Sequence, residues 1–327
     1  MRPAPETTPA APTARRPDPS PAERRQAYLV LAVSTFLFAL NHVIVRGVHA
    51  HVPPVGLSFW RWVLAALVLL PVVLVGWRAT LAVYRAEWRA FVLTGALVVG
   101  ATTLMMVALN FTTATNAALI NATQPVLTVL LSRLVYGVRF GTVQAFGIAI
   151  AFGGVLLMVA RGDWHTLISL DFRAGDLIAL LAMFGFAGYA IRFVRIPHRL
   201  SAARALFPMI VAGSVLLLPC YLLESLFHRP VPLTPTSIGA IVSIALLVSC
   251  GAMLLWNTGN RLVGANRASI FINLVPVFDV LLAVTFLGER FEPWHLGGMV
   301  LIGAGVLLVV RQSPPPVASP VPTRTRD

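Results

Sequence analysis

The sequence predicts an all-α integral membrane protein with ten transmembrane helices. Of its 327 residues, 57% are hydrophobic and only 11% are charged, whereas soluble domains carry about 25% charged residues. The apolar residues form long runs, and about 20 of them in a helix cross a hydrocarbon core of about 30 Å. The predicted spans cover approximately 27–45, 57–77, 90–109, 117–136, 142–160, 174–195, 206–226, 237–257, 267–287 and 294–311.

The segments that flank these spans are rich in proline. Residues 1–26 and 312–327 lack an apolar core, so both are expected to be disordered tails. The first apolar run is too long for the hydrophobic region of a signal peptide, and we expect it to remain as a helix. Cys220 and Cys250 lie inside apolar runs, which favours buried apolar roles over a disulfide framework.

The arginines predict how the helices are oriented. All 25 basic residues are arginine, which excludes a P-loop because its lysine is missing. Eighteen fall on the side of the two tails, five fall on the opposite side, and Arg61 and Arg133 fall within spans. The positive-inside rule therefore predicts a multi-pass protein of the inner (plasma) membrane with both termini cytoplasmic. The net charge of +13 does not indicate nucleic acid as a partner, because the arginines are spread over span edges and tails.

An internal duplication relates the two halves of the chain. A shift of 151 residues aligns segment 117–159 with segment 268–310 without a gap, and 15 of the 43 pairs are identical. An apolar composition produces chance matches of Leu, Val, Ala and Gly, but it does not readily align Pro, Arg and Phe. The identical pairs include Pro125/Pro276, Gly137/Gly288, Arg139/Arg290, Phe140/Phe291, Gly147/Gly298 and Gly154/Gly305.

The duplicated unit contains five spans, in residues 27–160 and again in residues 174–311. Because five is odd, the second unit enters the bilayer from the opposite side. The two units are therefore expected to be inverted five-helix repeats around a central cavity. Such a pair can open in turn to each side of the membrane, which predicts a transporter that works by alternating access.

Both units carry small, aromatic and polar residues in a recognisable order. In the first unit they are Phe59, Arg61, Pro125 and Gly147. In the second they are Gly251-Ala252, Trp256-Asn257, Ala268-Ser269, Pro276, Gly288-Glu289-Arg290, Gly298 and Gly305. Over about residues 27–311 this series resembles the EamA domain, in the ten-helix branch of the drug/metabolite transporter superfamily. The chain departs from the family pattern at Val138, where the family has Glu, and at Thr128 and Asp279, where it has small residues.

The resemblance implies a secondary transporter that exports amino acids or related small metabolites. A multidrug or toxic-compound exporter is the alternative within the family, and a non-transporting membrane receptor or scaffold is the alternative from another class. An enzyme is not expected, because neither H-E-x-x-H nor G-x-G-D occurs. No cofactor and no metal are expected. The expected partners are a small-molecule substrate and the lipid bilayer, with proton coupling as an option, and the oligomeric state is left open.

Asp279 and Arg61 are the strongest candidates for transport chemistry. A carboxylate inside the ninth span is costly unless it is paired, hydrated or protonated. Asp279 is interpreted as a proton-coupling or substrate-amine site, and the alternative is a structural carboxyl paired between helices. Arg61, near the outer end of the second span, could bind a substrate carboxylate or extend its side chain to the outer interface. An attraction between Arg61 and Asp279 across the cavity is a further option.

The fourth and ninth spans carry further polar candidates. Asn121, Gln124 and Thr128 recur at i, i+3 and i+7 and would share one face of a helix. Such groups either line an aqueous path or join helices by hydrogen bonds, and Asn273 in the ninth span has the same alternatives. Two prolines free a carbonyl group in mid-helix and are expected to kink these spans, Pro125 and Pro276.

The remaining candidates have a favoured structural interpretation. Asn41 and His42 lie in the outer third of the first span. Histidine can transfer protons near neutral pH, but a neutral hydrogen bond between helices is favoured. Trp256 and Tyr189 could stack on a substrate, although aromatic core packing is favoured. Glu289, which follows the ninth span, is interpreted as a loop or helix-cap anchor.

Overall fold

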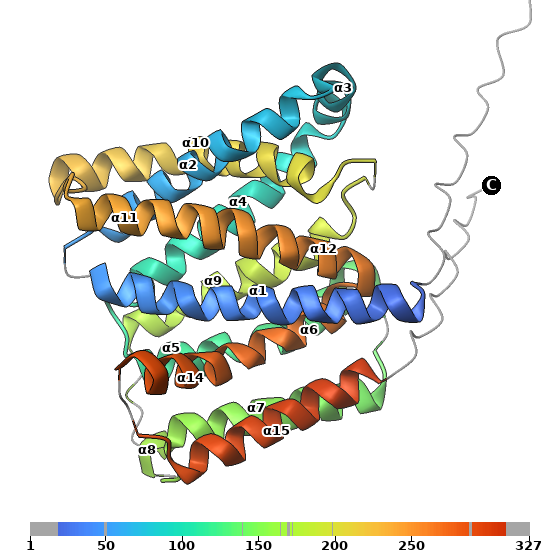
Figure 1. Ribbon diagram of the computed structural model, residues 1–327, viewed down its shortest axis with the longest axis vertical. Coiled ribbons are helices and arrows are strands. Elements are labelled where there is room, and N and C mark those ends of the chain that lie inside the picture. The colour runs from blue at the N-terminus through green and yellow to red at the C-terminus, as the bar shows by residue number, and fades with distance from the viewer. Residues whose placement is uncertain are drawn as a thin grey trace, which may run out of the picture.

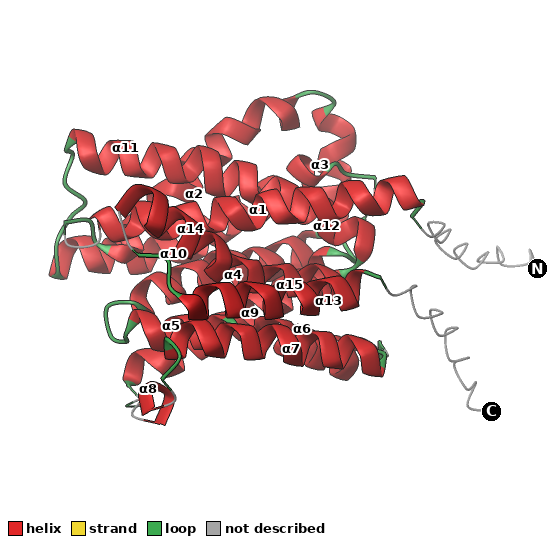
Figure 2. Cartoon of the chain, turned by 60° about the horizontal axis from the view of Figure 1, so that its bottom comes forward, coloured by secondary structure: helices red, strands yellow, loops and turns green. Residues whose placement is uncertain are grey.

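The computed structural model describes residues 19–48, 51–138, 140–163, 165–168, 171, 173–197, 199–287 and 290–311. Within these ranges all regular secondary structure is helical, and the helices form one bundle (Figure 1, Figure 2). Ten segments are long and apolar enough to cross a membrane, which confirms the predicted all-α fold and number of spans. They are Pro21–Val45, Pro54–Leu74, Trp88–Ala108, Asn116–Tyr136, Thr142–Ala160, Ala174–Phe193, Ala202–Phe227, Pro235–Val263, Ala265–Phe286 and Pro293–Val310.

Several of these spans consist of more than one helical element. The first half contains α1 (Pro21–Val48), α2 (Pro54–Leu74), α3 (Trp77–Ala86), α4 (Trp88–Ala108), α5 (Ala114–Asn121), α6 (Gln124–Tyr136), α7 (Thr142–Ala160) and the short α8 (His165–Ile168). The second half contains α9 (Ala174–Phe193), α10 (Ala202–Phe227), α11 (Pro235–Ser243), the π-helical segment η1 (Ile244–Ala252), α12 (Met253–Val263), α13 (Ala265–Ala268), the 3₁₀ segment η2 (Ser269–Leu274), α14 (Val275–Leu287) and α15 (Pro293–Val310).

Two predicted boundaries differ from the structure for local reasons. α1 begins at Pro21 rather than near residue 27, so the end of the predicted tail 1–26 is helical. A reciprocal cap explains the early start, because Ser20 N–H donates to Glu23 Oε2 at 2.8 Å and Glu23 N–H donates to Ser20 Oγ at 3.2 Å. The eighth span continues to Val263, beyond the predicted end at residue 257, because polar side chains follow the apolar run without ending the helix.

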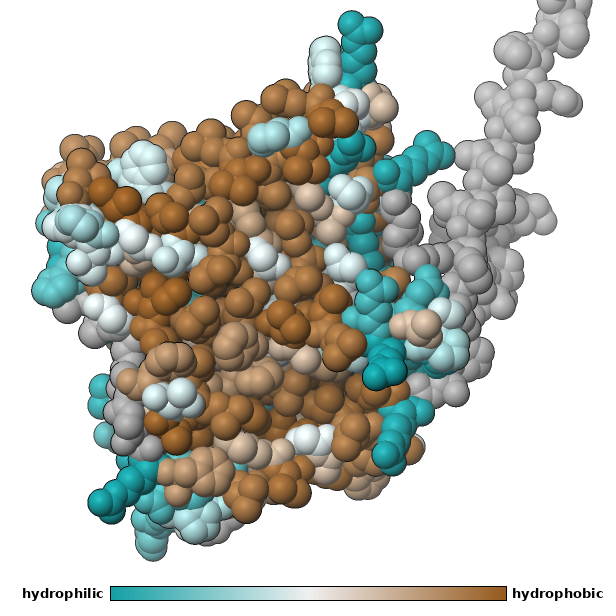
Figure 3. Space-filling model, viewed as in Figure 1, coloured by the Kyte–Doolittle hydropathy of each residue, from teal (hydrophilic) through white to brown (hydrophobic). Residues whose placement is uncertain are grey.

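The surface of the bundle matches a membrane environment. Figure 3 shows an apolar belt over the sides of the helices, with polar residues gathered at the ends. Large apolar side chains are exposed on these spans, including Phe146 of α7 at 68% and Leu226 of α10 at 76%. The hydroxyl of Tyr28 donates to the carbonyl oxygen of Val310 at 3.3 Å. The start of α1 and the end of α15 therefore lie together at one end of the bundle, as an even number of spans requires (Figure 1).

Glycines bring α7 and α15 into backbone contact. A Cβ atom added at Gly147 would lie 2.8 Å from the carbonyl oxygen of Gly305, and one added at Gly154 would lie 2.7 Å from that of Gly298. Under the shift of 151 residues, Gly147 corresponds to Gly298 and Gly154 to Gly305. The contacts are thus reciprocal, which is the pattern that a two-fold axis between equivalent helices produces. This pattern supports the predicted inverted repeat.

Side chains of α10 hold both ends of α2. At the start of α2, the carboxylate of Glu224 accepts the backbone N–H groups of Val55 at 3.1 Å and Gly56 at 2.6 Å. At the other end, Arg204 Nη2 donates to the carbonyl oxygen of Val75 at 2.7 Å. An anion at a helix N-terminus and a cation at its C-terminus both complement the helix dipole. We therefore expect α2 and α10 to behave as one rigid pair.

Replacing Glu224 with glutamine is expected to weaken this attachment. A neutral amide loses the charge-assisted bonds to the α2 N-terminus, at a cost of about 1–2 kcal/mol. The apparent Tm of the purified protein in detergent should fall by a few degrees. Glu87→Gln is the matched control, because Glu87 is exposed and makes no side-chain cap hydrogen bond at the start of α4. Equal Tm values for the two variants would contradict the proposed attachment.

Candidate functional site

An ionisable pair joins α1 to α14. His42 Nδ1 lies 3.1 Å from Asp279 Oδ2 and 3.3 Å from Asp279 Oδ1, although the residues are 237 positions apart in the sequence. The two side chains are 42% and 37% exposed. The structure therefore pairs Asp279 with His42, and Arg61 is not among the described partners of Asp279. A carboxylate with an imidazole at hydrogen-bond distance can exchange a proton with it and can lose the contact when protonated.

The equivalent interface in the other half has no such pair. Under the repeat shifts, His42 corresponds to Ala190 on α9, and Asp279 corresponds to Thr128 on α6. Ala190 is 1% exposed and Thr128 is fully buried, with its hydroxyl donating to the carbonyl oxygen of Gln124 at 2.8 Å. Thr128 is thus satisfied by its own helix. The contact between α6 and α9 is closed and apolar, whereas the contact between α1 and α14 is partly open and ionisable.

Arg61 is a buried cation on α2. The residue is only 3% exposed, so its side chain does not extend to the surface. Its Nε makes no hydrogen bond within the described part of the chain, and its guanidinium carbon lies 4.9 Å from the ring centre of Trp62. Contact with one aromatic ring offsets only part of the cost of removing a guanidinium from water. A group of opposite charge would therefore stabilise Arg61 at this position.

The π-helical segment η1 packs against both α1 and α2. On the α1 side, Ser34 Oγ donates to the carbonyl oxygen of Ala252 at 2.8 Å. On the α2 side, Cys250 Sγ lies 3.8 Å from the carbonyl oxygen of Ala65, one turn from Arg61. Ser249 within η1 is 1% exposed, and its hydroxyl has no partner among the described residues. π-Helical turns are frequent at functional sites, and this one lies between the helices that carry His42 and Arg61.

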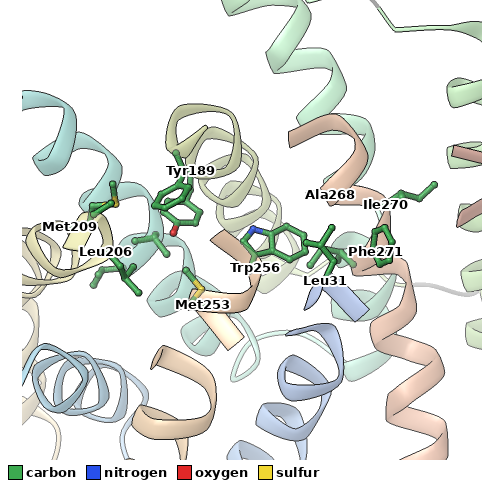
Figure 4. Packing of buried hydrophobic residues seen from close by; sticks show 14 of the residues in the cluster. Leu31, Tyr189, Leu206, Met209, Met253, Trp256, Ala268, Ile270 and Phe271 are labelled. Carbon is green, nitrogen blue, oxygen red and sulfur yellow. The ribbon is translucent and has the colours of Figure 1, made fainter. Parts of the chain in front are cut away.

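Tyr189 and Trp256 lie in the packed core. Figure 4 shows both residues among Leu31, Leu206 and Met253. The hydroxyl of Tyr189 donates to Asn257 Oδ1 at 2.7 Å, and the ring of Trp256 lies 6.0 Å from that of Phe38. Both side chains are almost fully buried, at 2% and 3% exposure. Their present contacts are therefore those of core packing.

The fourth and ninth spans are interrupted at equivalent positions. α5 ends at Asn121 and α6 begins at Gln124, while the ninth span changes from η2 to α14 after Leu274. Pro125 and Pro276 each occupy the second residue of the α-helix that follows the interruption. Asn121, Gln124 and Thr128 consequently do not lie on one continuous helix, because the first belongs to α5 and the others to α6. Interrupted helices expose backbone groups that can bind solutes.

Two amide side chains, one beside the interruption of the ninth span and one in α1, have polar atoms without a hydrogen-bond partner among the described residues. Asn273, at the end of η2, is 1% exposed, and neither its Oδ1 nor its Nδ2 bonds to a described residue. Asn41 Oδ1 is also buried without a partner in the described ranges. Buried polar groups are normally hydrogen-bonded, so each unpaired group marks a position where a solute or water can bind. These groups are enclosed by the packed core and do not line an open space. The central cavity expected from the sequence therefore stays a prediction.

Some polar residues with clear contacts were not among the sequence candidates. Glu224 is one, and Asp176 is another, since its carboxylate accepts hydrogen bonds from Thr112 Oγ1 and Asn116 Nδ2 and from the Arg173 backbone. A carboxylate at the edge of an apolar span is the signal that could have identified both. Glu289, a predicted cap anchor, lies outside the described residues.

The fold defines a multi-pass membrane protein whose described interior contains several polar side-chain atoms without a hydrogen-bond partner. Comparison with known proteins then identifies its family. The chain belongs to the EamA-like transporter family, whose model matches residues 25–160 and 173–311. It is therefore a transporter of the drug/metabolite transporter superfamily.

Individual relatives support this assignment. The chain is 31% identical to the "Uncharacterized transporter YyaM" of Bacillus subtilis over 78% of this chain and 83% of the relative. It is 27% identical to a "Probable amino-acid metabolite efflux pump" of Salmonella typhimurium over 88% and 95% of the two chains. It is 26% identical to a "Probable terminal-alkyne amino-acid exporter" of Streptantibioticus cattleyicolor over 61% and 64%. A crystal structure with 20% identity has the same fold, with a TM-score of 0.71 over 87% of this chain and 96% of the other.

Proposed function

We propose that this protein is a secondary transporter that exports amino acids or related small metabolites by alternating access. The observation that carries the proposal is Arg61, a buried guanidinium without a hydrogen-bonding partner for its Nε among the described residues. A substrate carboxylate supplies the missing charge, and guanidinium binds carboxylates through two parallel hydrogen bonds. The names of two relatives, which refer to amino-acid efflux and export, are consistent with such a substrate.

The remaining polar groups give the substrate its other contacts. Asn273 and Ser249 are buried and unsatisfied in the described structure, so they can bind the amino group or a polar side chain. Ser249 lies on the eighth span, in the segment η1 that packs against α2 and thus against the helix of Arg61, and Asn273 lies on the ninth span. Binding energy from these contacts is available only when the bundle opens enough to admit the solute.

Proton movement through His42 and Asp279 is the proposed source of coupling. Protonation of Asp279 removes the charge that attracts His42, so the contact between α1 and α14 weakens. Unit 27–160 and unit 174–311 then move against each other as inverted repeats. The arginine distribution supports a cytoplasmic location for both termini, with the spans in the inner membrane of a bacterial cell.

Reconstituted vesicles test the transport proposal directly. Vesicles containing the purified protein are loaded either with a panel of labelled amino acids or with a panel of labelled apolar organic cations. Efflux is compared with that from protein-free vesicles. Efflux of at least one amino acid supports the proposal. Efflux of apolar organic cations alone would replace it with a toxic-compound exporter, and inertness over both panels would favour a receptor or scaffold.

The pH dependence of flux tests the coupling residues. Asp279→Asn removes the titratable carboxylate but retains its shape, so the flux should become nearly independent of pH while the wild-type flux changes with it. Asp171→Asn is the matched control, since Asp171 is exposed and lies outside the ten spans. A pH profile of Asp279→Asn that follows the wild-type profile would exclude this carboxylate from coupling.

A further inference from the structure

The described residues form a hollow at the end of the bundle where α1 begins and α15 ends. It has a volume of about 410 Å³ and is open to the surface. Its lining consists of Pro21, Arg24, Arg25, Tyr28, Leu29 and Val310. The hydrogen bond from Tyr28 to the carbonyl oxygen of Val310 joins the two helices. The hollow is therefore built from the first and last spanning helices, which belong to different halves of the chain.

Two of the residues that line this hollow are arginines. Arg24 and Arg25 both line it, and no ion pair or hydrogen bond to either guanidinium occurs within the described ranges. Other described arginines flank spans at the same end of the bundle, among them Arg85, Arg89, Arg204 and Arg311. The two guanidinium groups therefore have donors without a described partner and lie at an end of the bundle that carries further arginines, which favours a ligand with negative charge.

The other residues that line the hollow are mostly apolar. Leu29 is 59% exposed, although it lies in the first apolar span, and Val310 is the last apolar residue of α15. Tyr28 lies between the arginines and Leu29 along α1, and tyrosine is a residue type that is enriched at membrane interfaces. Along α1 the lining thus changes from charged to apolar in about one turn, from Arg25 to Leu29. Such a change matches a molecule with an anionic head and a hydrocarbon tail.

We propose that this hollow binds an anionic phospholipid. The phosphate group contacts Arg24 and Arg25, and one acyl chain covers Leu29 and Val310. A small anion such as inorganic phosphate can contact the two arginines but leaves the apolar residues uncovered. A phospholipid can contact the arginines through its phosphate and the apolar residues through its acyl chain. Basic hollows between helices on the cytoplasmic side of a membrane are suited to such headgroups. The bound lipid links α1 to α15 and hence the two halves of the protein.

The test compares lipids on the purified full-length protein. Phosphatidylglycerol and phosphatidylcholine are titrated separately, and the thermal unfolding midpoint and the lipid retained in native mass spectrometry are measured. Phosphatidylglycerol should raise the midpoint and remain bound, whereas phosphatidylcholine should do neither. Inorganic phosphate is titrated in parallel. Equal stabilisation by phosphate would show a free-anion site and overturn the proposal, as would equal retention of the two lipids.

A pair of double variants locates the site. Arg24→Ala with Arg25→Ala should lower the apparent affinity for phosphatidylglycerol about tenfold. Arg85→Ala with Arg89→Ala removes the same charge from exposed positions on the tail side and should bind the lipid as the wild type does. An equal loss of affinity for phosphatidylglycerol in both double variants would indicate a general effect of charge and overturn the proposal. If the first variant does not fold, the single variants Arg24→Gln and Arg25→Gln provide the same comparison, and wild-type affinity in both would also overturn it.

Discussion

Arg61→Met is expected to reduce the export of carboxylate-bearing substrates about a hundredfold. Methionine has a similar length and fills the interior, but it cannot bind a carboxylate. A buried cation without an anionic partner destabilises the fold, so an apolar replacement should leave the protein at least as stable as the wild type. If Arg61 binds substrate, the variant loses transport but keeps or gains stability. If Arg61 were needed only for the fold, the variant would lose stability as well. Flux in vesicles and unfolding in detergent measure the two effects on the same preparation.

Two further variants make this result specific. Arg133→Met introduces the same change at an exposed arginine of α6 and should leave the flux unchanged. Arg61→Lys keeps the charge but loses the planar pair of donors, so it should retain only part of the flux. If Arg61→Met transports anionic and zwitterionic amino acids normally, the proposed carboxylate contact is wrong.

Gly154→Val is expected to prevent α7 and α15 from packing. The added Cβ would lie 2.7 Å from the carbonyl oxygen of Gly298 and 2.9 Å from Ile302 N, and backbone atoms cannot rotate away as a side chain can. The helices must therefore separate along the whole contact, at a cost of at least about 1–3 kcal/mol. Size-exclusion chromatography should show little monodisperse protein, and the remainder should unfold at a lower temperature.

The neighbouring residue provides a matched control. A Cβ added at Gly153 would meet no atom within 4 Å, so Gly153→Val makes the same change one position along the same helix. It should leave the chromatographic profile and the unfolding temperature close to those of the wild type. Equal damage from both variants would mean that valine itself, rather than the contact with α15, is harmful.

Hydropathy was sufficient to predict the ten spans, because crossing a hydrocarbon layer imposes a length and a composition that any 20-residue window reveals. It could not predict the interruption after Asn121 or the π-helical turns of η1, since both depend on the neighbours of each backbone group and not on average polarity. The start of α1 was in fact predictable. The pattern Ser20-x-x-Glu23 is that of a capping box, although proline-rich composition favoured a disordered tail there.

The candidate site was predicted residue by residue but not as an arrangement. Asp279 and His42 were both identified, yet their contact joins positions 237 residues apart, and no local pattern encodes it. Arg61 was expected either to bind a substrate or to reach the interface, and its 3% exposure removes the second alternative. Position along a span gives depth in the membrane, whereas burial depends on which neighbours surround the helix.

Under the proposed alternating-access mechanism, the reciprocal contact of α7 and α15 has a consequence for how the two access states differ in energy. The two-fold operation of that mechanism maps this contact onto itself, so we expect it to be the same in both states and to favour neither. The contact between α1 and α14 would instead be exchanged with that between α6 and α9. In the opposite state, His42 and Asp279 would therefore enter an environment as dry as the one around Thr128, where unpaired charge is least tolerated. The protonation of His42 and Asp279 would then determine the ratio between the populations of the two access states.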